Sequence, residues 1–290
     1  MADLILQALF SGVLTGGFYA LVALGLALVF GNMKIVNLAH GELVLLAAYV
    51  AYSGEAWLGL DPLLAIPLAM IVVCAAAVFI YLMVERIRVD RELNSLLLTY
   101  GIAIVLTNTV LLIWKSDVHS SSTPWFQDAL VLGNLYSMNS EWLFFLVSVA
   151  LLLLGTWWLR KSWYGRALRA VASNRDAAKL MGVNPRQTEL ISFVISGFLA
   201  TFAGIALFST TFIQPEIGDA LTIKAFIVTV LAGIGSIPGV LLGAILLGIV
   251  ESLTTALFSS SLQELAAMVL FLLVLFVMPN GLFGQKRRTA

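Results

Sequence analysis

Apolar residues gather along this chain in long runs that short polar stretches separate. A helix needs about 20 predominantly apolar residues to cross the hydrocarbon core of a bilayer. The runs therefore predict an all-α, polytopic membrane-embedded helical bundle of eight or nine spans, with residues 1–290 forming a single transmembrane domain. The nine apolar segments lie at about 4–30, 36–53, 63–84, 94–114, 141–159, 190–213, 221–237, 238–258 and 264–283.

Two of the nine segments carry interruptions. The second opens on the polar sequence NLAHGE, and the seventh runs into GIGSIPG, where Pro238 stands before another glycine. Broken helices at membrane depth are tolerated where protein or a water-filled cavity surrounds them. We therefore expect one or two broken or half-spanning helices, and a re-entrant second segment would reduce the spans to eight.

The composition is typical of a membrane protein and gives no support to other classes of protein. Hydrophobic residues make up 61% of the chain and charged residues 11%, whereas a soluble domain has about 25% charged residues. A net charge of zero gives no indication of a nucleic-acid partner. The single cysteine, Cys74, allows neither an internal disulfide nor a cysteine metal cluster, and the N-terminus lacks the basic start of a removable signal peptide.

Basic residues predict the orientation, because lysine and arginine concentrate in cytoplasmic loops. The longest basic stretch lies at 160–189, between the fifth and sixth apolar segments. With that loop in the cytoplasm, nine segments place the N-terminus outside and the C-terminal QKRRTA in the cytoplasm. Fourteen of the 16 basic residues then lie on the cytoplasmic side, and only Lys115 and Lys224 do not.

The basic loop contains start and stop signals for a short helix at about 174–181. Ser173 or Asn174 is a suitable N-cap, and Asp176 places a negative charge in the first turn. Gly182 stands where a left-handed residue ends a helix. The basic side chains around this helix, which suit the cytoplasmic face, are Arg166, Arg169, Arg175 and Lys179.

Charged residues inside the apolar segments are the candidates for chemistry, since by default they face the bundle interior or water. Glu42 follows His40 closely, and Asn37 is placed to cap a helix with His40 as its third residue. Backbone amides near Glu42 would then satisfy its carboxylate, and this structural interpretation and a transport role stay equally open. For Glu251 we expect burial with a hydrogen-bond partner ahead of a transport role.

On the outer side, Lys224 is expected to extend toward Asp219 or Glu216. The longest outer loop, at 115–140, is either an interfacial cover with aromatic anchors or a contact for a soluble extracytoplasmic partner. No phosphate-binding loop GxxxxGK[ST], zinc motif HExxH or nucleophile elbow GxSxG occurs. The chain is therefore expected to have no catalytic residue, no metal site and no cofactor of its own.

Several segments, in order, resemble the branched-chain amino-acid ABC permeases of the LivH type. The start, FYALVALGLALVFG followed by IVNLAHGELVLLAAYVAY, resembles their opening, and WYGRALRAVASNRDAAKLMGV resembles their cytoplasmic coupling loop. The last third, AFIVTVLAGIGSIPGVLLGAILLGIVES with FVMPNGLFG, is similar as well. The resemblance spans nearly the whole chain.

This resemblance implies the membrane-spanning subunit of an ABC importer in the bacterial plasma membrane. A second homologous permease would complete a heterodimer, two cytoplasmic ATPases would bind ATP and Mg, and an extracytoplasmic binding protein would deliver branched-chain or other apolar amino acids. The family's loop pattern, Glu-Ala-Ala with a glycine after three further residues, appears with aspartate in place of glutamate, and the Ile-x-Leu-Pro that follows it elsewhere is absent. The matching residues are Asp176, Ala177, Ala178 and Gly182.

Two groups of residues follow as site candidates. Coupling to the ATPases is assigned to Arg166, Arg169, Asn174, Arg175, Asp176, Ala177, Ala178 and Gly182. The translocation path is assigned to Asn37, His40, Glu42, Gly233, Gly235 and Glu251. The alternatives are a urea or short-chain amide ABC permease, which shares these segments, an ion-coupled secondary transporter, and, last, a membrane enzyme.

Overall fold

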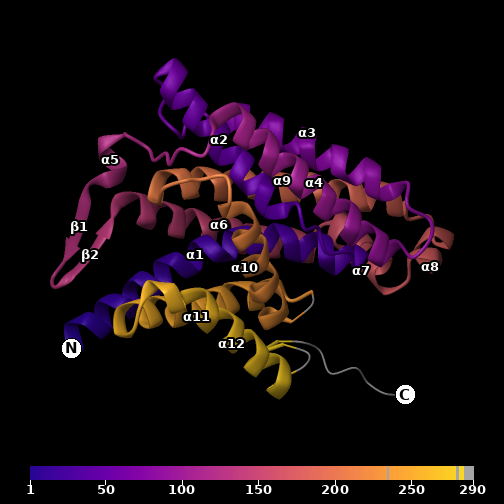
Figure 1. The fold of residues 1–290 in the computed structure, drawn as a ribbon. Helices are drawn as coiled ribbons and strands as arrows, with labels where there is room; N and C mark the ends of the chain where they lie inside the picture. Colours follow the sequence, from indigo (N-terminus) through magenta and orange to yellow (C-terminus); the bar gives the residue numbers. More distant parts are fainter. Residues whose placement is uncertain (234, 279–280, 284–290) are drawn as a thin grey trace.

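The computed structural model describes residues 1–233, 235–278 and 281–283. The basic C-terminal end, for which the sequence predicts a cytoplasmic location, lies outside these residues. Figure 1 shows the arrangement of the helices. In chain order they are α1 Ala2–Met33, α2 His40–Leu58, α3 Ile66–Glu85, α4 Arg91–Trp114, α5 Pro124–Gln127, α6 Asn139–Lys161, α7 Trp163–Ser173, α8 Arg175–Leu180, α9 Pro185–Thr210, α10 Ile217–Ala232, α11 Ile237–Leu257 and α12 Gln263–Val277, with a 3₁₀ turn at Ser260–Leu262 before the last.

Each of the nine predicted apolar segments forms a helix. Within the described part of the chain, seven helical stretches are long and apolar enough to cross a membrane, and the two segments outside this set are α2 and α10. Helix α10 has 16 residues, which gives a length of about 24 Å, less than the hydrocarbon core. These are the two segments for which the sequence predicts interruptions, and Pro238 lies in the first turn of α11, directly after the second break.

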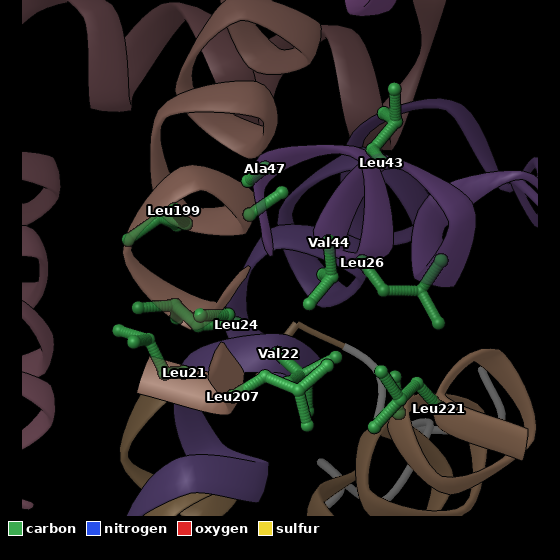
Figure 2. Close-up of a cluster of buried hydrophobic side chains, with 14 of the residues drawn as sticks. Leu21, Val22, Leu24, Leu26, Leu43, Val44, Ala47, Leu199, Leu207 and Leu221 are labelled. Atoms are coloured by element: carbon green, nitrogen blue, oxygen red, sulfur yellow. The ribbon is translucent and has the colours of Figure 1, made fainter. Parts of the chain in front are cut away.

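Helices α1 and α9 form the centre of the bundle, and they are the most buried of the seven candidate spans. Leucine and valine side chains from α1 meet side chains of α2, α9 and α10 (Figure 2). In lipid, such contacts stabilise a bundle through close packing, because lipid tails are as apolar as leucine. The labelled residues are Leu21, Val22, Leu24, Leu26, Leu43, Val44, Ala47, Leu199, Leu207 and Leu221.

Glycines bring α1 and α11 into backbone contact. A β-carbon on Gly12 would lie 2.6 Å from Ile249 Cα, and one on Gly248 would lie 2.3 Å from the Gly12 carbonyl oxygen. Gly16 lies as close to Ile245. Small residues four apart permit this approach in membrane helices, and Gly12 and Gly16 of α1 have this spacing.

Polar contacts identify two opposite ends of the bundle. At one end, Gln7 of α1 donates a hydrogen bond to the Tyr136 carbonyl oxygen at 2.7 Å. At the other end, Arg186 of α9 forms an ion pair with Glu85 of α3. The N-terminus lies at the first end and helices α7 and α8 lie at the second (Figure 1), which is the relative arrangement that nine segments predict.

The loop between α4 and α6 contains a small antiparallel hairpin that the all-α prediction did not include. Strand β1, Ala129–Leu132, pairs with β2, Leu135–Met138. The two connecting residues are Gly133, with a positive φ of 65°, and Asn134. A Gly-Asn pair between short apolar runs is a hairpin signal, and it is the signal that the prediction overlooked.

Candidate functional site

The loop between α6 and α9 folds into two short helices, and we call residues 162–184 the elbow. The Asn174 side chain accepts hydrogen bonds from the backbone amides of Asp176 (3.1 Å) and Ala177 (2.9 Å) at the start of α8. Asp176 lies in the first turn, and Gly182 has the positive φ of 82° that ends the helix. The predicted helix and its Asn174 cap are therefore confirmed.

Helix α7, which precedes α8 in the elbow, was missed. The Ser162 hydroxyl caps it by accepting a hydrogen bond from the Gly165 amide at 3.0 Å. Tyr164, Ala167 and Val171 are buried on one side of α7, at the spacing that places side chains on a single helical face. That periodicity was the available signal, although the many charges between these residues obscured it.

A buried carboxylate connects the elbow to two long helices. Glu189 of α9 is 1% exposed and pairs with Arg175 of α8 at 2.8 Å and with Arg91 of α4 at 3.0 Å. Both guanidiniums reach both carboxylate oxygens. The hydrogen bond to Glu189 raises the pKa of Arg175, so the pair stays charged and holds α8 against the bundle.

A second connection runs through Tyr164 of α7. Its hydroxyl bonds to the Ser192 hydroxyl at 2.7 Å and to the Thr188 carbonyl oxygen at 2.9 Å, both on α9. Asn32 of α1 donates to the same Ser192 hydroxyl at 2.9 Å. Burial raises the pKa of Tyr164 to about 12, so the phenol remains protonated, and the elbow is linked to the last turns of α1 as well as to α9.

The other two arginines assigned to coupling, Arg166 and Arg169, bond to the end of α6. Arg166 donates to the Lys161 carbonyl oxygen at 3.1 Å, and Arg169 donates to the Leu159 carbonyl oxygen at 3.0 Å. These carbonyls lie at the C-terminal end of α6, where cations are favourable. Both arginines therefore stabilise the junction of α6 with the elbow, a role that the sequence prediction did not assign.

The tip of the elbow presents two large apolar side chains. Leu180 is 88% exposed and Met181 is 84% exposed. They sit at the end of α8, between the buried Ala178 and the exposed Gly182. Apolar side chains on a rigid, otherwise polar projection indicate a docking surface.

The cap at Asn174 yields a test of elbow rigidity. Replacing Asn174 with alanine removes both acceptors and is expected to cost about 1 kcal/mol of helix stability, which corresponds to about fivefold faster amide exchange at Asp176 and Ala177. Hydrogen–deuterium exchange measures this directly. The matched control is Asn184→Ala, which removes the corresponding cap of α9, and equal exchange at the α8 amides in both variants would contradict the assignment.

Inside the bundle, the first turns of α2 and α10 meet. The Thr222 hydroxyl accepts a hydrogen bond from the Gly41 amide at 2.8 Å, and a β-carbon on Gly41 would lie 2.0 Å from the Gly218 carbonyl oxygen. The predicted capping by Asn37 was wrong. Helix α2 begins at His40, and Asn37 stabilises the preceding turn by accepting from the Ala39 amide.

His40 and Glu42 lie at this junction in different surroundings. His40 is fully buried and bonds to the Val22 carbonyl oxygen at 2.8 Å and to Ser196 at 3.3 Å, which ties α2 to α1 and α9. Both Glu42 carboxylate oxygens are buried without a hydrogen-bond partner among the described residues. The predicted satisfaction of Glu42 by backbone amides is therefore wrong, because the carboxylate lies against Gly218 of α10 instead.

Glu251 forms a separate cluster between α1, α10, α11 and α12. One of its oxygens, Oε2, accepts hydrogen bonds from Tyr19 (2.5 Å), Lys224 (2.9 Å) and Gln263 (2.7 Å). The expected burial of Glu251 with partners is confirmed. The expected direction of Lys224 was wrong, because its ammonium group pairs with Glu251 of α11 and not with Asp219 or Glu216.

Gly233 and Gly235 belong to neither interior cluster. Both have a φ of 85° and connect α10 to α11. Gly235 faces Gly31, near the last turn of α1, so these glycines serve the turn at the elbow end of the bundle. The structure therefore brings the coupling candidates together in one elbow, and it distributes the translocation candidates over three places.

Sequence reasoning missed the residues that anchor the elbow, above all Arg91, Glu189 and Tyr164. The signal for Glu189 was a lone acid at the entry of an apolar segment, directly after a strongly basic loop. A charge in that position requires a partner. Its two partners, Arg91 of α4 and Arg175 of α8, lie far apart in the sequence, so the pairing itself could not be predicted from spacing.

Comparisons with known proteins agree with this architecture. The chain is 33% identical to BraD of Pseudomonas aeruginosa, a high-affinity branched-chain amino acid transport system permease protein, over 97% of this chain and 96% of that protein. It is 34% identical to LivH of Escherichia coli, which has the same description, over 97% and 96%. A probable branched-chain amino acid transport permease protein LivH of Methanocaldococcus jannaschii is 29% identical over 91% and 88%. No solved structure matches.

The match to a family model covers the bundle and the elbow together. It runs over residues 8–278, from the second turn of α1 to the end of α12, and the description of the model is branched-chain amino acid transport system / permease component. The capped elbow and the apolar helices from α2 to α12 lie within it, together with most of α1. The chain is a polytopic membrane protein and belongs to the family of permease components of branched-chain amino acid transport systems.

Proposed function

We propose that this chain is the membrane-spanning permease subunit of an ABC importer for branched-chain or other apolar amino acids. The substrate class is supported by the relatives BraD and LivH, which are branched-chain amino acid transport system permease proteins. The observation that carries the coupling role is the elbow, a capped projection with a buried ionic anchor and an exposed apolar tip. In this proposal a second homologous permease completes a heterodimer, two ATPases supply the energy, and a binding protein delivers the substrate.

The elbow faces the cytoplasm of a bacterium in this proposal. Lys34, Arg86, Arg88, Arg160 and Lys161 flank helices that end or begin at the elbow end of the bundle. Cytoplasmic loops are rich in such residues. The opposite end, with the N-terminus and the hairpin, then faces the binding protein.

Coupling proceeds through the contacts of the elbow. Leu180 and Met181 bury their side chains in a groove of an ATPase subunit, and closure of the ATPases on ATP displaces α8. The Arg175–Glu189 pair transmits the displacement to α9, and Tyr164 transmits it to α9 and α1. Because α1 and α9 are the centre of the bundle, their movement changes access to its interior.

The apolar tip provides the test of this function. Leu180→Ala and Met181→Ala are each expected to weaken binding of the ATPase subunits about tenfold, since loss of a buried large side chain costs about 1–2 kcal/mol. Leu112→Ala is the matched control, because Leu112 is 86% exposed on α4 near the opposite end. Affinity is measured between purified permease in nanodiscs and the ATPases.

Equal affinities for all three variants would overturn the docking role. An ion-coupled secondary transporter, the competing function, would import substrate after ATP depletion with the ion gradient intact. A urea or amide permease would import those compounds in place of leucine. Uptake by the reconstituted complex, with each substrate and with or without ATP, separates the three functions.

A further inference from the structure

A groove of about 410 Å³ with several polar side chains lies on the side of the bundle formed by α1, α11 and the start of α12. Its size is within the range of small-molecule sites. The groove begins close to the hairpin, where Gln7 bonds to Tyr136, and it reaches the Glu251 cluster. The polar side chains that line it are Gln7, Ser11, Thr15, Glu251, Ser252, Thr255 and Gln263.

These polar side chains form continuous rows along the helices. Gln7, Ser11 and Thr15 stand four residues apart, and therefore lie on one face of α1. A row of polar groups at membrane depth faces protein or a water-filled cavity, because lipid cannot satisfy it. This row therefore argues against a lipid-facing surface, and in the proposed importer the groove lines the interior space between this permease and its partner permease.

Glu251 brings an unused acceptor to the inner end of this groove. Its Oε2 atom accepts all three hydrogen bonds, from Tyr19, Lys224 and Gln263. Its Oε1 atom is buried and has no partner among the described residues, although the side chain is only 1% exposed. A buried carboxylate oxygen without a donor is costly, so it indicates a place for a donor that arrives from outside the chain.

We propose that this groove binds the amino acid during its passage, and that Glu251 Oε1 accepts a hydrogen bond from the α-ammonium group. This inference rests on the importer function and names the contact by which the permease recognises its substrate. The side chains of Ser252 and Thr255 line the same groove, and their hydroxyls would contact the polar part of the zwitterionic amino acid. Leu4 and Ala8 line the apolar part, and Lys224 pairs with the other carboxylate oxygen, Oε2, at 2.9 Å.

The first arm of the test separates substrate contact from a merely structural ion pair. Glu251→Gln alone leaves Lys224 without its partner, whereas the double variant Glu251→Gln with Lys224→Met removes both charges. The wild-type and variant complexes, with their ATPases and binding protein, are reconstituted in liposomes, and ATP-driven uptake of L-leucine is measured. Both variants are expected to lose at least about tenfold in uptake, as for the loss of one charge-assisted hydrogen bond.

Stimulation of ATP hydrolysis by the leucine-loaded binding protein is expected to persist in these variants. Glu264→Gln, an exposed acid at the start of α12, is the control and is expected to leave uptake unchanged. Normal uptake by the double variant would overturn the proposal and reduce the cluster to an ion pair. Absence of ATP-driven uptake in the wild-type complex would instead refute the importer function itself.

A second pair of variants tests the groove even if the Glu251 variants fail to assemble. Ser11→Val and Thr255→Val remove groove hydroxyls and leave the Glu251 cluster intact. A reduction of about threefold or more in uptake for either, with an unchanged amount of assembled complex, supports the groove as the path. Unchanged uptake in both would overturn it.

Discussion

Replacing Glu189 with glutamine is expected to lower ATP-driven import by about a hundredfold while the protein still inserts and assembles. The substitution removes the charge that Arg175 and Arg91 share. Hydrogen bonds to charged groups contribute about 1.5–3 kcal/mol each. A loss of about 3 kcal/mol reduces the population of molecules in which Glu189 holds the elbow against the bundle about a hundredfold.

The expected effect is large because α8 has little stability of its own. It has six residues, and isolated helices shorter than about 12 residues are marginal in water. Its side-chain anchor to the long helices is the Arg175–Glu189 pair. Without that pair, ATPase movement bends the elbow in place of moving α9, so ATP hydrolysis continues without import.

The control for this prediction is the neighbouring exposed pair. Glu85→Gln breaks the ion pair with Arg186, whose side chain is 74% exposed, and exposed pairs contribute only about 0–1 kcal/mol. Import and hydrolysis are measured together in proteoliposomes as ATP consumed per leucine imported. An unchanged ratio in Glu189→Gln would show that the ion pairs of Glu189 do not transmit movement from the elbow to the bundle.

Local signals in the sequence predicted the helices of this fold and the cap of the coupling helix. The apolar runs gave all nine segments because hydrophobic length is read directly from the chain. Asn174, Asp176 and Gly182 gave the boundaries of α8, because capping depends on neighbours within a few residues. Both kinds of signal act over short distances, so the sequence was sufficient.

Long-range pairings were outside the reach of these signals. Glu189 meets Arg91 from 98 residues away, and Glu251 meets Tyr19 from 232 residues away. Each carboxylate was recognisable as a residue in need of a partner, but several cations and phenols were available. The fold chooses the partner, and for this reason Lys224 was directed to the wrong acid.

The contact of α1 with α11 shows the same difference between a local signal and a long-range partner. The spacing of Gly12 and Gly16 indicated a close helix approach, but it did not identify the helix that approaches. The partner is the region of α11 around Gly248, and this glycine has no glycine four residues before or after it. Backbone contact there places the polar faces of both helices beside each other, as the proposed groove requires.

Gly12→Ala is therefore expected to destabilise the bundle strongly, by about 3 kcal/mol, and to lower the thermal midpoint in detergent by about 10 °C. The new β-carbon would lie 2.6 Å from Ile249 Cα. Because this neighbour is a backbone atom, no side-chain rotation relieves the overlap, and α1 and α11 must separate.

The same substitution at Gly101 of α4 is the control, since no atom of the described residues outside the local helix backbone lies within 4 Å of a β-carbon there. Alanine favours a helix over glycine by about 0.5–1 kcal/mol, so Gly101→Ala is expected to keep or raise the midpoint. A midpoint for Gly12→Ala equal to that of Gly101→Ala would show that α1 and α11 are not held in backbone contact. The wall that carries the proposed substrate groove would then lack its support, because Gly248 lines the groove and faces Gly12.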